Sequence, residues 1–343
     1  MTVRALATIE KIVEVAPIPD ADAIERVRVR GWDVVTKRDE FRPGDHCVYF
    51  EVDSLLDVTD ERFAFLAPRG VRTDAEGHSG HVLRTARLRG QVSQGLALPL
   101  SAFPEILDRC AGEDVTDALG ILKWEPPIPA ELAGTIAGPW PGWIPKTDEE
   151  RIQNVPNILG VRDIGWVATE KIDGTSCTIF IEGDVDGVCS RNLNLAETPN
   201  TLWRIAREIC LHEKLRAMLR LGWDSDRLAV QGEVFGEGIQ GNPLKLKGQH
   251  FRIFNLVDRT GSVTRAWWPD QITAHTVPVL DLAFPVTLAD ALAQADGLRS
   301  TLAKDKAAEG VVWRSRSMEM LPGANVRASF KVISNRYLLK GDR

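Results

Sequence analysis

The chain has 343 residues, of which 44% are hydrophobic and 26% are charged, a balance typical of a globular protein with room for two domains. Its 42 basic and 48 acidic residues give a formal net charge of −6, which argues against a protein that coats nucleic acid non-specifically but allows a local basic cleft. No apolar stretch approaches the roughly 18 residues of a membrane-spanning helix, so we expect no membrane association. The five cysteines include no CxxC pair, and we expect reduced thiols in a cytoplasmic protein.

The N-terminal part, residues 1–118, shows short β-rich runs separated by turn residues. Strands are predicted over residues 8–15, 24–29, 32–35, 47–52 and 97–99. About five short strands in about 100 residues are typical of a small β-barrel, and the OB-fold is the commonest barrel of that size. The glycine- and charge-rich stretch 68–81 is expected to be a loop.

Residues 119–146 differ from what precedes them, because prolines and tryptophans become frequent. Prolines at this density prevent regular secondary structure and favour an extended connector. Trp124, Trp140 and Trp143 indicate that this connector lies against a domain surface.

The remaining residues, 147–343, mix helical and strand-like patterns. One helix is predicted over residues 200–221, with Thr198 or Asn200 as its N-cap, and a second over residues 288–303. Strand-like runs occupy residues 166–168, 177–181, 227–230, 251–257, 310–313 and 329–333.

The run Lys171-Ile172-Asp173-Gly174 closes one β-rich stretch and opens another. A lysine at the end of a strand, followed by a tight turn into the next strand, directs its amine into the cleft that the sheet lines. That layout suits covalent catalysis by lysine. So short a motif also occurs by chance in many chains, and the residues further along must decide.

Five further motifs follow in order along the chain. They are Ser190-Arg191-Asn192, Gln231-Gly232-Glu233, Phe251-Arg252-Ile253-Phe254-Asn255, Glu309-Gly310-Val311-Val312 and Phe330-Lys331-Val332. Each alone is explained by a turn, a packed strand or a solvated charge. In this order, they resemble the covalent nucleotidyltransferase superfamily of polynucleotide ligases and mRNA capping enzymes. In that superfamily the lysine of the KxDG motif receives AMP or GMP through a phosphoramidate bond.

The resemblance implies roles for the residues around the first motif. Lys171 resembles the nucleophile. Asp173 resembles the acidic residue that contacts the ribose, and Gly174 completes the same motif. Glu170 matches a residue that reads the amino edge of adenine in RNA ligases. Arg191 is similar to the arginine that contacts the ribose and the acceptor end.

The later motifs resemble the contacts to base, metal and phosphate. Phe254 is similar to the aromatic residue that stacks on the base, and Lys331 to the lysine that contacts the α-phosphate. Glu233 and Glu309 resemble carboxylates that bind a divalent metal, and Glu233 also matches a ribose contact. Mg²⁺ and Mn²⁺ both accept such oxygen ligands.

Attack on phosphorus requires a neutral amine, whereas a free lysine is almost fully protonated at pH 7. We expect neighbouring cations, namely a metal, Lys331 and Arg191, to lower the pKa of Lys171. Two positions depart from the superfamily pattern. Ser329 stands where many relatives have a second lysine, and Asn255 stands where aspartate is frequent.

The order of the predicted domains indicates which branch of the superfamily the chain resembles. DNA ligases and capping enzymes carry an OB domain after the last motif, whereas here few residues follow Asn335 and the predicted barrel comes first. This arrangement resembles the ATP-dependent RNA ligases of the Deinococcus and Naegleria type. We therefore expect an α+β chain with an N-terminal OB-fold β-barrel (1–118), a Pro/Trp-rich linker (119–146) and a nucleotidyltransferase domain of antiparallel sheets with flanking helices (147–343).

The resemblance implies an ATP-dependent RNA ligase that uses Mg²⁺ or Mn²⁺ and seals 3′-OH and 5′-phosphate ends or nicks. The intermediates would be lysyl-AMP and an adenylylated 5′-phosphate. RNA, or a nicked duplex that contains RNA, is the expected partner, with no obligate protein partner. The alternatives are a DNA ligase or capping-type nucleotidyltransferase, and a non-catalytic RNA-binding or end-sensing protein.

Five further cations are candidates for phosphate contacts. By resemblance, Lys146 and Arg151 reach the phosphates of ATP; a solvated charge run is the alternative. Arg84, Arg87 and Arg89 alternate in a stretch predicted to be one strand, which would form a basic stripe for RNA. The alternative for these three is a charged, protected strand edge.

His78 and His81 are three residues apart, and with the upstream Cys47 they are candidate ligands of a zinc ion. A structural zinc site requires more sulfur or nitrogen ligands than this stretch offers, so chance is the better explanation.

Overall fold

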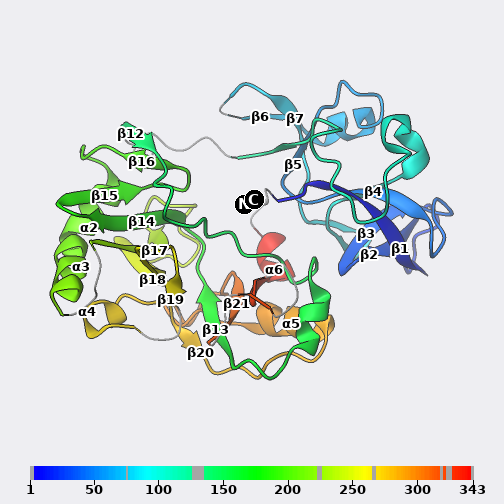
Figure 1. Ribbon diagram of the computed structural model, residues 1–343. Coiled ribbons are helices and arrows are strands. Elements are labelled where there is room, and N and C mark those ends of the chain that lie inside the picture. Colours follow the sequence, from blue (N-terminus) through cyan, green and yellow to red (C-terminus); the bar gives the residue numbers. More distant parts are fainter. Residues whose placement is uncertain are drawn as a thin grey trace. The chain divides into compact units, whose positions relative to one another are not determined.

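The computed structural model describes residues 4–74, 76–125, 135–221, 226–264, 268–316, 320–321 and 327–340. The chain divides into two compact units, residues 1–127 with 338–343, and residues 128–337 (Figure 1). The division falls inside the predicted linker, whose own bounds at 119 and 146 stay a prediction. No helix within the described residues is long and apolar enough to cross a membrane.

The first unit is built on a five-stranded antiparallel sheet in the order β10-β4-β1-β2-β3. Its strands are β1 (Ala7–Pro17), β2 (Ile24–Val29), β3 (Trp32–Lys37), β4 (His46–Phe50) and β10 (Leu96–Pro99). These match the five predicted strands to within a few residues at each end.

A second sheet and a hairpin complete the first unit. The sheet has the order β11-β5-β7-β6 and comprises β5 (Ser54–Leu56), β6 (Arg72–Thr73), β7 (Ser79–Val82) and β11 (Leu122–Lys123). The hairpin pairs β8 (Ala86–Leu88) with β9 (Gln91–Ser93), and short 3₁₀ helices are η1 (Ala64–Arg69), η2 (Leu100–Ala102) and η3 (Pro104–Ile106). The prediction of a loop over 68–81 is wrong in part, because β6 and β7 pair within it.

Apolar side chains lie on both faces of the five-stranded sheet. On β4, Tyr49 packs with Trp32 on one face, and Phe50 packs with Phe63 and Phe103 on the other. All five rings are buried. Alternation of side chains along a strand places neighbouring residues on opposite faces, so one run of apolar residues supplies two cores.

The second unit contains two antiparallel sheets (Figure 1). The seven-stranded sheet has the order β12-β16-β15-β14-β17-β18-β19, with β12 (Ile136–Pro139), β14 (Thr175–Glu182), β15 (Val185–Cys189), β16 (Leu193–Leu195), β17 (Arg227–Gly236), β18 (Gln249–Asp258) and β19 (Val263–Thr264). The four-stranded sheet has the order β20-β13-β21-β22, with β13 (Trp166–Lys171), β20 (Val279–Leu280), β21 (Gly310–Ser315) and β22 (Ser329–Ile333). The helical elements are η4 (Pro156–Gly160), α2 (Thr201–Glu208), α3 (Leu211–Arg220), α4 (Asp270–Thr273), α5 (Leu288–Gly297) and α6 (Asn335–Leu338).

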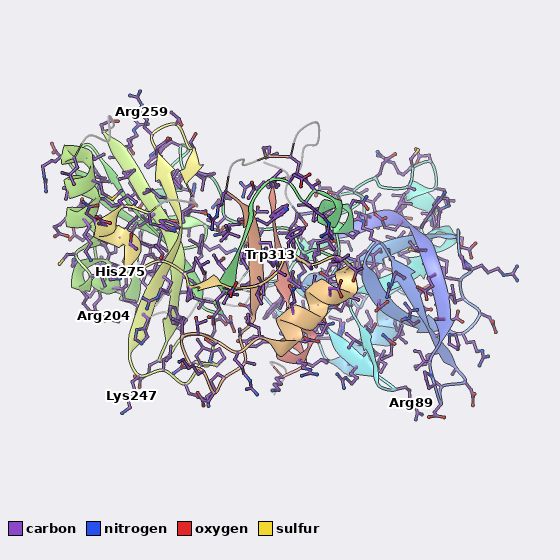
Figure 2. All side chains as sticks on the ribbon, turned by 90° about the horizontal axis from the view of Figure 1, so that it is seen from below. Arg89, Arg204, Lys247, Arg259, His275 and Trp313 are labelled. Carbon is purple, nitrogen blue, oxygen red and sulfur yellow. The ribbon has the colours of Figure 1, made fainter. Side chains whose placement is uncertain are left out.

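Helices cover one face of each sheet. Helices α2 and α3 close a core with Ile179, Val230 and Ile253 of the seven-stranded sheet. Helix α5 packs on the four-stranded sheet, where Trp313 is buried (Figure 2). A smaller cluster joins Phe254 of the seven-stranded sheet to Ile172, which directly follows β13, and to residues of the segments between the two sheets; we call it the Phe254 cluster.

The single helix predicted over 200–221 is wrong, because α2 and α3 are separate. Cys210 between them has a φ of 50°, in the left-handed region that interrupts a helix. Asn200 is confirmed as the N-cap, since its side chain accepts a hydrogen bond from the backbone N–H of Trp203 at 3.0 Å. Helix α5 ends at Gly297 rather than 303, because the Leu298 carbonyl accepts from the N–H of Ala308 instead.

The predicted linker contains more regular structure than expected. Strand β12 pairs with β16 at the edge of the seven-stranded sheet, a position that tolerates Pro139. The expected contact of tryptophans with a domain surface is confirmed for Trp143, whose ring meets Phe180 edge-on at 6.3 Å. The prolines at 126, 127 and 129 lie outside the described residues.

Candidate active site

Lys171 is the last residue of β13, and the chain turns at Asp173 and Gly174 into β14. The turn lies directly against β17: a Cβ built on Gly174 would sit 2.2 Å from the carbonyl oxygen of Val234 and 2.9 Å from Cγ of Glu233. Only glycine permits that approach. The glycine of the motif therefore brings the end of β13 next to the strand that carries Glu233.

The Lys171 amine is bound by a carboxylate from far along the chain. Both carboxylate oxygens of Glu309 lie 2.7 Å from Nζ, and the two side chains are 24% and 11% exposed. Glu309 directly precedes β21, whose first residue, Gly310, pairs with Lys171. A Cβ on Gly310 would sit 2.0 Å from the carbonyl oxygen of Val332, so this glycine is also required by close packing.

The electrostatic environment of Lys171 is acidic. Burial is the largest single influence and lowers the pKa of Lys171, but Glu309, Glu233 and Asp173 together raise it above its ordinary value. Our expectation that neighbouring cations lower the pKa of Lys171 is therefore wrong for Lys331 and Arg191, because carboxylates dominate the surroundings of the amine, and the lowering by a metal stays a prediction. Arg191 is ion-paired elsewhere, 2.9 Å from Asp148.

The carboxylates themselves are hard to ionise in this environment. Burial and the charges of Glu309 and Asp173 raise the pKa of Glu233 to about 8, although Lys171 and Arg191 oppose the shift. Burial and Glu309 also raise the pKa of Asp173 to about 6, against a hydrogen bond from Tyr337. Clustered, partly desolvated carboxylates are the environment in which a hard divalent cation binds most favourably.

Strand register brings Lys331 to the face of the sheet that carries Lys171. Thr169 of β13 is opposite Val312 of β21, which is opposite Lys331 of β22. Directly opposed residues share a face, and so do residues two apart on one strand, so Lys171 and Lys331 point to the same side. On the other sheet, Glu233 is paired with Ser176 of β14 and with Arg252 of β18.

Phe254 occupies an irregular position in β18. The pairing with β17 moves from Gln231–Asn255 to Gly232–Ile253, which leaves Phe254 as the extra residue of a β-bulge. A bulge re-aims the side chain of the extra residue. The Phe254 side chain accordingly packs with Ile172 of the lysine motif, away from the helix-covered core that contains Ile253.

Glu170 points to the opposite face from Lys171. It is 2% exposed, and its Oε2 accepts hydrogen bonds from the backbone N–H of Thr301 at 2.9 Å and from Thr301 Oγ1 at 2.5 Å. The next residue, Leu302, packs with Ile172 and Phe254. Glu170 is therefore fixed to the segment that borders the Phe254 cluster.

The segment that enters the unit carries the other predicted cations. Lys146 Nζ lies 3.8 Å above the ring of Trp140 and donates to the Arg191 carbonyl at 3.1 Å. Arg151 forms a parallel bridge to Lys331 and is 8% exposed. That burial contradicts the solvated-charge alternative for Arg151 and places it beside the predicted phosphate contact.

The predicted basic stripe does not lie on one strand. Strand β8 contains Arg87 alone, since it spans only residues 86–88. Arg84 precedes the strand, and its guanidinium carbon is 5.5 Å from the Trp124 ring centroid. Arg89 follows the strand in a turn with a φ of 47° and is exposed (Figure 2). The alternation expected for a single strand is therefore wrong, because a hairpin turn begins at Arg89.

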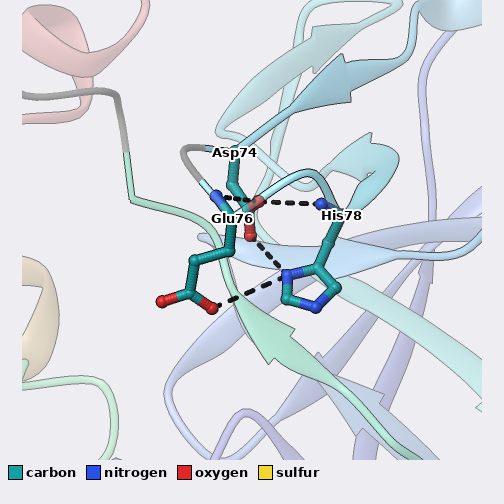
Figure 3. A group of neighbouring side chains, drawn as sticks. All are labelled: Asp74, Glu76 and His78. Atoms are coloured by element: carbon teal, nitrogen blue, oxygen red, sulfur yellow. Dashed lines mark hydrogen bonds and ion pairs between the residues drawn. The ribbon is translucent and has the colours of Figure 1, made fainter.

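In the same unit, Asp74, Glu76 and His78 bring ligand atoms within 4.8 Å of one another (Figure 3). His78 Nδ1 lies 3.0 Å from Asp74 Oδ2 and 3.8 Å from Glu76 Oε2. The group includes neither His81, whose Nδ1 is 2.8 Å from the Gly70 carbonyl, nor the buried Cys47.

Several residues of the site were missed by sequence reasoning. The Tyr337 hydroxyl donates to Asp173 Oδ2 at 2.7 Å, Thr301 holds Glu170, and Arg314 donates to the Phe254 carbonyl at 3.0 Å. Tyr337 lies just beyond the last motif in a chain with only two tyrosines, which is a weak signal. Thr301 carries no sequence signal, because its contact depends on a loop.

Comparison with known proteins gives consistent matches over the whole chain. A family model described as an OB-fold domain matches residues 6–100, and one described as RNA ligase matches residues 164–333. A search of curated proteins finds no match. Among solved structures, the chain is similar to a mutant of Naegleria gruberi RNA ligase without ligand, at 41% identity and a TM-score of 0.87 over 100% of both chains.

Two further structures of the same ligase agree. The pyrophosphate-bound form is 42% identical, with a TM-score of 0.87 over 99% of this chain and 100% of that one. A mutant with ATP and Mn is 40% identical, with a TM-score of 0.85 over 97% and 98%. These matches confirm the α+β class and the predicted order of an OB-fold followed by a nucleotidyltransferase domain. The chain belongs to the RNA ligase family.

Proposed function

We propose that this chain is an ATP-dependent RNA ligase in which Lys171 carries AMP to a 5′-phosphate end, and that it seals nicks as well as free ends. The observation that carries the proposal is the Lys171 amine at a strand end, held by Glu309 at 2.7 Å, on the face it shares with Lys331. Relatives solved with ATP, AMP, pyrophosphate and Mn support the choice of nucleotide and metal.

In the first step, Lys171 Nζ attacks the α-phosphorus of ATP. An N–P bond forms, the bond to the pyrophosphate oxygen breaks, and the amine loses a proton. Because the charge of the amine is favoured by its carboxylate neighbours, that proton must leave before attack. Glu309 lies within hydrogen-bonding reach of Nζ and is the nearest acceptor among the described residues.

The donor set fits a divalent cation. Glu233 of β17 and Glu309, which directly precedes β21, would supply oxygen ligands, and Asp173 lies near both. Burial and the neighbouring carboxylates of Glu309 and Asp173 disfavour the charged form of Glu233, which additional positive charge would stabilise. Mg²⁺ or Mn²⁺ would supply that charge, neutralise the α-phosphate and remove the negative potential that keeps Lys171 protonated.

The remaining residues position the nucleotide. Phe254 offers one face to the adenine, a contact worth about 1–3 kcal/mol in comparable sites. Lys331 and the adjacent Arg151 place positive charge beside the α-phosphate. Glu170, anchored through one oxygen, is assigned to the amino edge of adenine. Arg191 is assigned to the ribose and the acceptor end, and Lys146, beside it, to the phosphates.

The second and third steps transfer AMP and seal the strand. A 5′-phosphate oxygen attacks the phosphorus of lysyl-AMP, a P–O–P bond forms and the amine of Lys171 is released. The 3′-hydroxyl then attacks the activated 5′-phosphorus and expels AMP. Arg84, Arg87 and Arg89 remain candidates for RNA contact as separate exposed or half-buried cations. A reducing, cytoplasmic location is part of the proposal and is supported by five cysteines outside any disulfide.

Nicked duplexes of defined strand composition test the substrate. The enzyme is incubated with ATP, Mg²⁺ and duplexes whose 3′-OH strand is RNA or DNA, and the products are separated on a denaturing gel. We expect sealing when the 3′-OH strand is RNA and much slower sealing when it is DNA. Equal sealing of both would contradict the RNA preference and favour the DNA ligase alternative. Lysyl-AMP formation without sealing of any end would favour an end-sensing protein.

A further inference from the structure

Arg314, which contacts Phe254, forms a buried ion pair with Glu149. Arg314 Nε and Glu149 Oε1 are 3.2 Å apart, and the two side chains are 8% and 6% exposed. Burying two opposite charges seldom adds stability, whereas breaking such a pair by removing one partner is costly. A pair of this kind is therefore more readily explained by what it positions than by what it contributes to folding.

Arg314 reaches both the backbone and the ring of Phe254. Its Nη1 donates to the Phe254 carbonyl at 3.0 Å, and its guanidinium carbon lies 5.4 Å from the ring centroid. Because Phe254 is the extra residue of a bulge, the regular ladder does not fix its orientation. A planar guanidinium with several fixed donors replaces the missing constraint.

The other end of the pair is held by the sheet that carries the nucleophile. Glu149 Oε2 accepts a short hydrogen bond from Ser329 of β22, and Ser329 is paired with Arg314 across the β21–β22 ladder. Strand β21 also pairs with β13, where Lys171 ends the strand. The contacts thus connect the bulge of the seven-stranded sheet to the four-stranded sheet.

We propose that Arg314, held by Glu149, is a positioning residue that fixes Phe254 for stacking on the adenine of ATP. This inference rests on the proposed function, because it requires Phe254 to contact the base. In this proposal Arg314 acts through Phe254 rather than by its own contact with the base. Without Arg314 the bulge can relax, and the ring loses its fixed orientation and part of its stacking contact.

The test measures KM for ATP and kcat of enzyme adenylylation in Arg314→Met, with Phe254→Ala as reference and with the double variant. We expect Arg314→Met to raise KM about tenfold and to change kcat by less than about threefold, since uniform binding is lost. In the Phe254→Ala background the same substitution should change KM by less than about twofold, because coupled residues are not additive. Arg314→Lys should recover only part of the loss.

Arg216→Met is the matched control. Arg216 also joins a carboxylate, Asp186 at 2.5 Å, and a backbone carbonyl, Gly183 at 2.9 Å, but it lies on α3. Its substitution should leave KM for ATP unchanged. If Arg314→Met does not fold, as judged by its thermal transition, Ser329→Ala provides the test, and we expect a rise in KM of about two- to threefold from a looser Glu149.

An unchanged KM for ATP in the folded variants would overturn the inference, and so would a full effect of Arg314→Met in the Phe254→Ala background. In either case, adenylylation of the wild-type enzyme would still support the proposed function. A wild type that accepts no AMP would overturn both. A rise in KM that vanishes in the Phe254→Ala background supports the inference, since a merely structural defect would persist there.

Discussion

Replacing Gly174 with alanine puts a methyl group into space that β17 already fills. The new carbon would lie 2.2 Å from the Val234 carbonyl oxygen, 2.9 Å from Cγ of Glu233 and 3.0 Å from the Val234 carbonyl carbon. Two of these three atoms are backbone, so the turn has to move. Overpacking of this kind costs about 1–3 kcal/mol. At roughly 2–4 °C per kcal/mol for a domain of 150–250 residues, the thermal midpoint should fall by about 2–12 °C.

The same displacement should disable the chemistry. A shift of about 1 Å in a catalytic group costs about 10²-fold, and Gly174→Ala moves Asp173 and Glu233 together. The assay is the initial rate of AMP transfer to the enzyme from α-labelled ATP, alongside thermal unfolding. Gly160→Ala is the control, because its Cβ would meet nothing within 4 Å. Equal rates and equal midpoints for the two variants would refute the argument that Gly174 is required by close packing.

Four further results are expected. Tyr337→Phe removes the 2.7 Å hydrogen bond to Asp173 and should slow AMP transfer about tenfold, or about 1.4 kcal/mol, in single-turnover kinetics; an unchanged rate would exclude a role for this hydroxyl. Thr301→Val removes the hydroxyl hydrogen bond to Glu170 and leaves the backbone one, and it should lower the preference for ATP over GTP at least about fivefold in kcat/KM; an unaltered ratio would show that this hydroxyl has no part in the choice of base. Asn200→Ala removes a helix cap and should cost about 0.5–2 kcal/mol in denaturant unfolding with AMP transfer intact, and a smaller loss would show that the cap is dispensable. Chelation by EDTA should abolish AMP transfer, and either Mg²⁺ or Mn²⁺ should restore it; transfer that persists in EDTA would contradict the metal role of the carboxylates.

The strands of the site were predictable because their chemistry is local. The β22 bounds, Ser329–Ile333, coincide with the prediction, and Lys171 ends β13 as its motif implied. The pairing of these strands could not be predicted from the sequence. Lys171 and Glu309 are 138 residues apart, and no periodicity in the sequence relates them. Only the resemblance to known ligases connected the two.

The features that could not be predicted from the sequence are irregularities of the backbone and a pKa shift that depends on several charges together. The apolar pattern continues through Cys210, so the left-handed residue that splits the helix leaves no trace. The bulge at Phe254 also has no signature in the sequence, so the contact from Arg314 to the Phe254 carbonyl could not be predicted either. The raised pKa of Lys171 follows from several carboxylates acting at once, and its sign cannot be obtained from one partner at a time.

The most direct test of the account is the identity of the residue that accepts AMP. The wild-type enzyme is incubated with ATP and Mg²⁺, digested, and mapped by peptide mass spectrometry. We predict adenylate on the peptide that contains Lys171, through a bond that is labile to acid and stable to base, and none on Lys171→Ala. Adenylate on another residue, or on the Lys171→Ala variant, would contradict the central claim.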